Sequence, residues 1–408
     1  MLRNSGIMSS SARPASANTR ARRLLTELEH PRLAFANITP NWFAAVMGTG
    51  IVANAAAGLP LQFPALHFAA IAMWMLASLL LLVLVFATVV HWLAFPDTAR
   101  GHHLNPIMAH FYGAPPMALL TVGAGTLLVG HWVIGMPAAV AIDSVLWSVG
   151  TVLGLFSAVA VPYLSFTRHT VADDSAFGGW LMPVVPPMVS AATGALLLPH
   201  IPTAGQLRLT MMLACYAMFG LSLIASFVVI TLLWGRLSRH KVGAAAMVPT
   251  LWIVLGPLGQ SITAAVLLGA AAHLVVPAPW STALALFGVI FGVPVLGFAM
   301  LWGTIAVAIT VRTARSGLPF SLSWWSFTFP VGTCVTGVTG LAVHTGSSAL
   351  AVLAVLLFAV LVTAWAVVAV RTFRGSVIRG TLLAAPAASP AAATPAAPVA
   401  PAALAPSR

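Results

Sequence analysis

The side chains of this chain that could contact a solute are mostly hydroxyls and amides set within long apolar segments. Alternate apolar segments contain no Asp, Glu, Lys or Arg except at their ends. A dehydrated cation needs an opposing charge or a dense cage of carbonyl oxygens, so this pattern argues against cations. Hydroxyl, amide and glycine N–H donors can instead replace the water around an anion weakly. The polar residues concerned are Thr49, Thr121, Ser190, Thr193, Ser261, Thr263, Thr328, Thr333, Thr336 and Gln260.

The composition excludes a soluble fold. The 408 residues include only 18 Lys or Arg and 6 Asp or Glu, which is 6% charged against about 25% in globular proteins. Hydrophobic residues make up 60% of the chain, so too little polar surface exists to cover a body in water. The two cysteines, Cys215 and Cys334, lie in apolar runs, and the sequence predicts neither a disulfide framework nor a metal site.

Ten apolar segments are long enough to cross a bilayer as helices, which takes about 20 residues. They are 42–58, 67–95, 111–130, 137–166, 179–199, 207–234, 247–273, 280–310, 324–344 and 349–370. Of the 18 Lys and Arg residues, only Arg208 falls in a loop on one side of this arrangement. Because cytoplasmic loops hold the excess of positive charge, we expect a multi-pass protein of the plasma (inner) membrane with both termini in the cytoplasm.

The chain divides into three predicted regions. Residues 1–36 form a basic, disordered cytoplasmic tail, although their Ser, Ala and Arg content also suits an organellar transit peptide. Residues 37–372 form the ten-helix transmembrane domain. Residues 373–408 form a second disordered cytoplasmic tail, because the Pro/Ala run at its end cannot bury apolar area or hold a regular helix.

The odd-numbered apolar segments are interrupted by Pro and Gly, whereas the even-numbered ones are mostly uninterrupted. The interruptions recur about every 70 residues, at Met47, Pro116, Pro187, Pro257 and Pro330. Proline frees backbone groups that lipid cannot satisfy, so interrupted helices belong inside. The sequence therefore predicts an all-α membrane protein of five helical hairpins in a pseudo-five-fold arrangement around a central pore. The alternative is that Pro and Gly serve close helix packing.

The interrupted segments supply the predicted pore. Phe329 directly precedes the break at Pro330, where its ring could project into a narrow lumen and block it, or could simply pack. The pore-lining candidates are Phe43, Gly48, Thr49, Gly50, Phe111, Pro116, Pro187, Pro257, Gln260, Ser261, Thr328 and Pro330.

Two groups of titratable residues have both a functional and a structural interpretation. Asp143 is the only acid within a predicted span and is a candidate proton-coupling group. It also lies near the start of an outer helix, where a carboxylate favours the helix dipole, and we prefer that reading. His91, His102, His103 and His110 cluster around one loop. Their spacing matches no metal motif, so solvated loop histidines are the preferred interpretation.

Three stretches of the sequence resemble the tellurite-resistance/dicarboxylate transporter family. They are WFAAVMGTGI at 42–51, GPLGQS at 256–261 and WWSFTFPVG at 324–332. This family includes bacterial tellurite-resistance proteins, plant slow anion channels, fungal malate permeases and fungal sulfite efflux pumps. The last two stretches are more similar to the fungal branches than to the plant channels.

The resemblance implies five helical hairpins around a pore, a homotrimer with one pore per protomer, and no covalent cofactor. It also implies that Phe329 is the pore gate. The chain lacks the long, phosphosite-dense tails of the plant channels, so kinase-controlled gating is not expected.

The sequence therefore predicts a passive or proton-coupled permease for small anions, with sulfite efflux ahead of C4-dicarboxylate (malate) transport. A chloride/nitrate-type anion channel is one alternative. A non-transporting receptor or scaffold is another, which would tolerate larger side chains at Gly48 and Gly50. No Gly-x-Ser-x-Gly elbow, paired mid-membrane carboxylates or His-Glu-x-x-His motif is present, so we expect no enzyme. The expected partners are anions and the lipid bilayer, with no nucleic acid.

Overall fold

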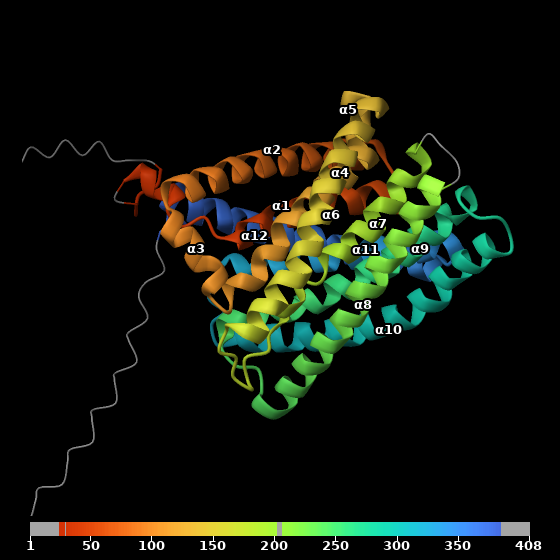
Figure 1. The fold of residues 1–408 in the computed structure, drawn as a ribbon. Helices are drawn as coiled ribbons and strands as arrows, with labels where there is room; N and C mark the ends of the chain where they lie inside the picture. The colour runs from red at the N-terminus through yellow and green to blue at the C-terminus, as the bar shows by residue number, and fades with distance from the viewer. Residues whose placement is uncertain (1–23, 29, 202–205, 385–408) are drawn as a thin grey trace, which may run out of the picture.

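The computed structural model describes residues 24–28, 30–201 and 206–384. Within these residues every regular element is a helix and no strand occurs. The α-helices are α1 (Phe43–Gly58), α2 (Pro64–Ala94), α3 (Pro96–Leu104), α4 (Ala114–Gly125), α5 (His131–Ile134), α6 (Met136–Thr167), α7 (Pro186–Leu197), α8 (Gln206–His240), α9 (Leu255–Ala271), α10 (Trp280–Arg315), α11 (Phe329–Thr345) and α12 (Ser348–Phe373). Figure 1 shows the long helices in one bundle, with α2 along one edge and α10 along the opposite edge.

Eight helical segments of the described chain are long and apolar enough to cross a membrane, so the chain is a multi-pass membrane protein. They contain α2, α4, α6, α8, α9, α10, α11 and α12. The two remaining predicted spans, 42–58 and 179–199, correspond to α1 and α7, which have 16 and 12 residues. Neither α-helix alone reaches the length of about 20 residues that a crossing needs. Helix length therefore supports eight of the ten predicted spans.

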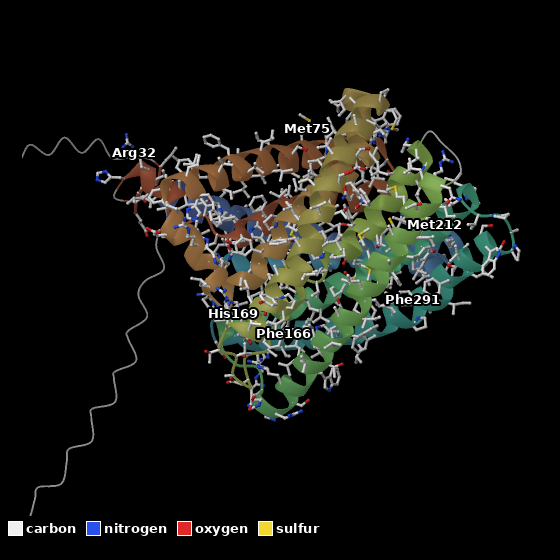
Figure 2. The ribbon with its side chains drawn as sticks, in the orientation of Figure 1. Arg32, Met75, Phe166, His169, Met212 and Phe291 are labelled. Atoms are coloured by element: carbon white, nitrogen blue, oxygen red, sulfur yellow. The ribbon has the colours of Figure 1, made fainter. Side chains whose placement is uncertain are left out.

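The helices fall into two classes by burial. In the most apolar stretches of α2, α6, α8, α10 and α12, only 17–33% of the residues are buried. In the segments that contain α4, α9 and α11, the buried share is 67–89%. Nearly every residue of α1 and α7 is buried as well. Figure 2 shows Met75 of the exposed class, on α2, pointing out from the bundle. Burial thus follows the distinction between interrupted and uninterrupted segments.

The five buried helices pack in a closed circuit. Helix α1 contacts α4, α4 contacts α7, α7 contacts α9, α9 contacts α11, and α11 returns to α1. Each is followed in the chain by an exposed helix that packs against it, namely α2, α6, α8, α10 and α12. We call α1, α4, α7, α9 and α11 the inner helices and the other five the outer helices. A solute that crossed between the inner helices would be shielded from lipid.

Every inner helix is preceded by a short 3₁₀ segment. The five segments are η2 (Pro40–Trp42), η3 (Met108–Gly113), η5 (Gly178–Leu181), η7 (Ala245–Val254) and η9 (Leu322–Phe327). In α4, α7 and α11 a proline stands in the first turn, where its missing N–H costs no helical hydrogen bond. Proline therefore starts these helices rather than kinking their centres.

Glycines allow the inner helices to approach closely. A Cβ on Gly259 of α9 would clash with the backbone of Thr333 and Cys334 on α11. A Cβ on Gly332 of α11 would clash with Ile51 of α1. These glycines serve helix packing, as small residues do in other membrane proteins. The interrupted helices therefore lie inside the bundle, and their glycines also serve close packing.

The two ends of the described chain lie together. The backbone N–H groups of Leu25, Thr26 and Glu27 donate to the carbonyls of residues 377–379 at 2.8–3.2 Å. The π-helical turn η10 (Arg374–Arg379) continues α12 up to this contact. The described parts of both predicted tails are thus hydrogen-bonded to each other, and the rest of both tails lies outside the described residues. Both ends enter the bundle from the same side.

Candidate functional site

A small cavity lies where the first turns of the inner helices meet. Its volume is about 30 Å³, enough for about one water molecule. Four of the inner helices or the 3₁₀ segments before them contribute to its wall, together with Met182 and Val185 from the turn between η5 and α7. Its lining residues include Met47, Phe111, Met117, Met182, Val185, Ile253, Gly256, Pro257, Trp325, Phe329 and Pro330. The wall is mostly apolar, with the Ser326 hydroxyl as its one small polar side chain, so an anion would meet little space and few donors here.

Phe329 is held in this wall by the break between η9 and α11. Thr328 separates the two helices, and its hydroxyl donates to the Trp325 carbonyl at 2.7 Å. Phe329 is the first residue of α11, with Pro330 directly after it. The ring is 5% exposed and faces the same cavity as Phe111. The local sequence thus fixes the direction in which this ring projects.

A second, wider cavity lies among the C-terminal halves of the same helices. Its volume is about 380 Å³ and it shares no lining residue with the small cavity. On α9 the two walls are one helical turn apart, since Pro257 lines the small cavity and Gln260 the wide one. The polar residues of its wall are Asn54, Thr193, Gln260, Thr263, Thr336, Thr339 and His344. The two cavities therefore follow one path between the inner helices.

The wide cavity presents neutral polar groups. Gln260 makes no hydrogen bond to the described residues, so its amide is free to face a solute. Thr263 and Thr336 share a hydrogen bond of 2.8 Å across the α9–α11 contact. The hydroxyl of Thr339 has no partner within the described chain and can donate, whereas the Asn54 amide donates to the Thr121 carbonyl at 3.1 Å and leaves only its own carbonyl oxygen, an acceptor, unpaired. No Asp, Glu, Lys or Arg lines either cavity. The path can thus solvate an anion weakly without pairing it to a fixed charge.

Five of the predicted site residues lie on this path. Phe111, Pro257, Phe329 and Pro330 line the small cavity, and Gln260 lines the wide one. The other candidates are buried but line neither cavity: Phe43, Gly48, Thr49, Gly50, Pro116, Pro187, Ser261 and Thr328. The structure thus brings together the breaks of α9 and α11 but not every residue next to a break.

Helical periodicity explains most of the residues that miss the path. On α1 most of the lining residues form one face at about 100° per residue, namely Ala44, Met47, Ile51, Asn54, Ala55 and Gly58, and Ala57 beside this face also lines the wide cavity. Thr49 lies on another face, and its hydroxyl accepts a hydrogen bond of 3.1 Å from Trp365 of the outer helix α12. Ser261 lies one residue past Gln260, and its hydroxyl donates to Leu258 at 2.8 Å. Adjacent positions on a helix therefore have different roles.

Gly48 and Gly50 lie at helix contacts instead. A Cβ on Gly48 would clash with Thr328 and Trp325, and one on Gly50 would clash with Thr121 of α4. Larger side chains at these positions would disturb packing whether or not the protein transports a solute. Substitutions at Gly48 and Gly50 can therefore separate a transporter from a scaffold only in variants that still fold.

Sequence reasoning missed Asn54 and Thr339. Neither lies at a proline break, which was the signal that selected the other candidates. Each follows another lining residue at helical spacing: Ile51 precedes Asn54 by three positions, and Thr336 precedes Thr339 by three. The 3.6-residue period counted from a known lining residue would have found both.

Asp143 is buried at the contact between α6 and α4. Its side chain is 0% exposed, and neither carboxylate oxygen has a hydrogen-bond partner among the described residues. The carboxylate fills the space beside Gly123, where any Cβ would clash with it. The next residue of α4, Ala124, lines the wide cavity. Asp143 thus packs against α4 beside a residue of the cavity wall and is buried by protein, which the dipole interpretation did not anticipate.

The histidines are more buried than the sequence suggests. His91 is 0% and His110 6% exposed, so neither is the solvated loop residue that the sequence predicts. The Nδ1 atom of His91 lies 2.9 Å from the Phe35 carbonyl, and its ring stacks on His102 at 5.2 Å. Burial, with His91 and His103 nearby, lowers the pKa of His102. The described residues contain no group of three His, Cys, Asp or Glu that could hold a metal ion.

The path and its lining fall within a region that matches a known family. Residues 37–373 match the sequence profile of SLAC1, the voltage-dependent anion channel family. The chain belongs to this family. The match includes all five inner helices and both cavities, and it confirms the family resemblance seen in the sequence. As a SLAC1-family protein, the chain is a membrane transporter or channel for anions.

Individual relatives agree with this assignment. The chain is 27% identical over 332 residues to the sulfite efflux pump SSU1 of Trichophyton rubrum, covering 79% of this chain and 86% of the relative. It is 29% identical over 303 residues to an uncharacterized transporter of Methanocaldococcus jannaschii, covering 73% and 82%. The sulfite efflux pump SSU1 of Candida albicans is 27% identical over 321 residues, covering 73% and 64%.

Proposed function

We propose that this SLAC1-family protein moves sulfite out of the cell through the path between its five inner helices. The observation that carries the proposal is the pair of cavities along that path. The wide cavity offers neutral donors, and the small cavity is closed by Phe329 and its apolar neighbours. An anion held by neutral donors can enter and leave readily, which transport requires. Phe329 is the gate in this proposal.

We propose that ten helices cross the membrane in a pseudo-five-fold arrangement. Together with η2, helix α1 extends from Pro40 to Gly58, which is about 28 Å at the rise of a helix. Helix α7 is continued directly by η6 (Leu198–His200), and a turn at 182–185 connects it to η5. Each 3₁₀ segment followed by an inner and an outer helix makes one of five similar units. The closed circuit of inner helices supports this arrangement.

The distribution of positive charge supports a plasma (inner) membrane protein with both termini in the cytoplasm. Hydrogen bonds connect three of the regions between the predicted spans that carry part of this charge. Arg236 donates to the Asp174 carbonyl at 3.0 Å, and His169 lies 3.1 Å from the His103 carbonyl. These loops therefore share one end of the bundle. We further propose a homotrimer with one path per protomer, which the mass of the purified protein would test.

The choice of sulfite over a dicarboxylate rests on the relatives and on the lining. Several relatives are sulfite efflux pumps. A dicarboxylate such as malate carries two separated charges, and proteins commonly hold carboxylates with Arg in paired hydrogen bonds. Neither cavity offers Arg or Lys. Malate transport is the second candidate, because the wide cavity has room for either anion.

Asp143 is proposed as a proton-coupling residue. A buried carboxyl without a partner is a candidate for binding and releasing a proton during transport. Its place behind Ala124 would allow its protonation state to affect the wall of the wide cavity. Replacing Asp143 with Asn keeps the shape and removes the titratable group. We expect Asp143→Asn to abolish the response of flux to a pH gradient, with Asp97→Asn, an exposed acid, as the control.

The direct test is a flux panel with purified protein in liposomes. Sulfite, malate, chloride and nitrate are compared at two pH gradients and two membrane voltages. We expect sulfite flux above that of malate and above empty vesicles. Larger malate flux would favour the dicarboxylate permease, and larger chloride or nitrate flux the anion channel. If no anion moved faster than in empty vesicles, the chain would be a non-transporting receptor or scaffold.

A further inference from the structure

Another large cavity of the described chain lies away from the two path cavities. It is a groove of about 820 Å³ between the C-terminal ends of α8 and α10, and it shares no lining residue with the two path cavities. Both outer helices pack against α9, which lies behind them. We call this cavity the α8–α10 groove. It opens on the outer surface of the bundle, where transport through the centre gives it no role.

The walls of the α8–α10 groove are apolar and firmly placed. Trp302 is 2% exposed, and its indole N–H donates to the Leu251 carbonyl at 2.9 Å. The ring of Trp234 lies 6.0 Å from that of Trp302. Ile305 and Ile309 extend the same wall along α10. Such a surface suits an acyl chain, and tryptophans gather where chains meet headgroups.

The rim of the groove carries two cations without an acidic partner. Lys241 and Arg312 both line it. The Nζ of Lys241 has only the Ser238 carbonyl as a partner, at 3.4 Å. The Arg312 side chain makes no hydrogen bond or ion pair to the described residues. The one ion pair among those residues joins Arg100 and Asp97. Basic residues at helix ends also favour the helix dipole and set topology. Those effects explain the two positive charges but not the α8–α10 groove beside them.

A second copy of the chain is a poor match for this rim. The whole sequence has only 6 acidic residues. One of them, Asp143, is fully buried, and Asp174 lies next to Arg236 of its own chain. The membrane offers better charge complementarity, because its cytoplasmic leaflet is rich in anionic lipids. The groove volume of about 820 Å³ also lies within the range of about 300–1,000 Å³ that is typical of small-molecule sites.

We infer that the α8–α10 groove binds one anionic phospholipid of the cytoplasmic leaflet. The lipid phosphate lies between Lys241 and Arg312. An acyl chain lies along Trp234, Trp302 and Ile309. This site is separate from the proposed transport function, and it holds whichever anion the protein carries.

Native mass spectrometry of the full chain in detergent tests the site. Phosphatidylglycerol and phosphatidylcholine with the same acyl chains are titrated against wild type, Lys241→Gln/Arg312→Gln and Arg239→Gln/Arg315→Gln. The last variant loses the same charge close to the same two helix ends, at residues that do not line the groove. We expect one tightly bound phosphatidylglycerol per chain in wild type, weakened about tenfold in the first variant and less than about twofold in the second.

Several results would overturn the inference. They are equal weakening by the two double variants, equal binding of phosphatidylcholine, and displacement of the lipid by glycerol phosphate alone. A change of oligomeric state in Lys241→Gln/Arg312→Gln would assign the groove to a second copy. If that variant fails to fold, fluorescence quenching by phosphatidylglycerol with brominated acyl chains decides instead. The inference requires that Trp234→Phe lowers the amount of fluorescence quenched by the brominated lipid. The same quenching in Trp234→Phe and wild type would contradict lipid binding in the groove.

Discussion

Phe329 is the single residue that we propose closes the path. It begins α11, directly after the break at Thr328, and its ring shares a cavity of about 30 Å³ with Phe111 and Met47. A mostly apolar constriction of this size excludes a hydrated anion by size and by the scarcity of donors. Opening the path therefore requires the ring to move or the inner helices to separate.

Removing the Phe329 ring is expected to raise resting flux. A barrier lower by about 1.4 kcal/mol corresponds to about tenfold faster passage. We expect Phe329→Ala to increase anion flux in proteoliposomes by about that factor. The matched control is Phe327→Ala, since Phe327 packs against Trp252 and Trp324 outside the small cavity. Unchanged flux through a folded Phe329→Ala protein would show that Phe329 is not the gate.

Gln260 and Ser261 provide a second matched pair. Gln260 presents an unpaired amide to the wide cavity, whereas the neighbouring Ser261 hydroxyl is bonded to Leu258. A hydrogen bond to a charged group contributes about 1.5–3 kcal/mol. We expect Gln260→Leu to reduce flux at least about tenfold and Ser261→Ala less than about twofold. Equal effects of the two substitutions on initial rates would contradict the assigned lining face.

These neighbours also mark what the sequence could and could not predict at this scale. Composition identified hydroxyls and amides as the polar groups of the interior, and Gln260, Thr263 and Thr336 do line the cavity. Thr49 and Thr328 were equally plausible by residue type, but their hydroxyls are used by Trp365 and by a backbone carbonyl. Which face of a helix meets its neighbours depends on packing between distant segments. Residue type alone does not contain that information.

At the scale of elements, the inner helices combine a broken start with close contacts. The repeated breaks at Pro187, Pro257 and Pro330 were visible in the sequence. The sequence did not show that each inner helix follows a 3₁₀ segment, nor that Pro187 lines neither cavity. Two spans also proved too short as α-helices alone, because their first residues belong to 3₁₀ turns or loops. Hydropathy measures the length of a segment and not its helical type.

Gly259 tests the close contact between α9 and α11. An added Cβ there would meet the backbone of Thr333 and Cys334, which cannot rotate away as a side chain could. Overpacking of this kind costs about 1–3 kcal/mol. We expect Gly259→Ala to lower the melting temperature of the detergent-solubilised protein. Gly297→Ala on α10 is the control, because nothing lies within 4 Å of its added Cβ. Equal melting temperatures for the two variants would contradict the tight α9–α11 contact.

At the scale of the whole molecule, the helices form two layers that differ in burial. Outer helices such as α12 are 17% buried in their most apolar stretch, and the segment containing α9 is 89% buried. Interrupted segments could be assigned to the interior from the sequence, since lipid cannot satisfy freed backbone groups. The two cavities could not, because they depend on how five helices from distant parts of the chain meet. The two cavities lie along the same inner helices, and the path is closed at the smaller cavity.

The central claim is that anions pass between the inner helices, and cysteine modification of the wide cavity tests it most directly. Thr339→Cys places a thiol of similar size in the wall, while Thr363→Cys places one on the exposed face of α12. The native Cys215 and Cys334 are buried, so wild type gives the background. A negatively charged, membrane-impermeant thiol reagent is applied on both sides of the proteoliposomes. We predict that it blocks most anion flux through Thr339→Cys and leaves Thr363→Cys and wild type unchanged. Full labelling of Thr339→Cys with undiminished flux would contradict the account.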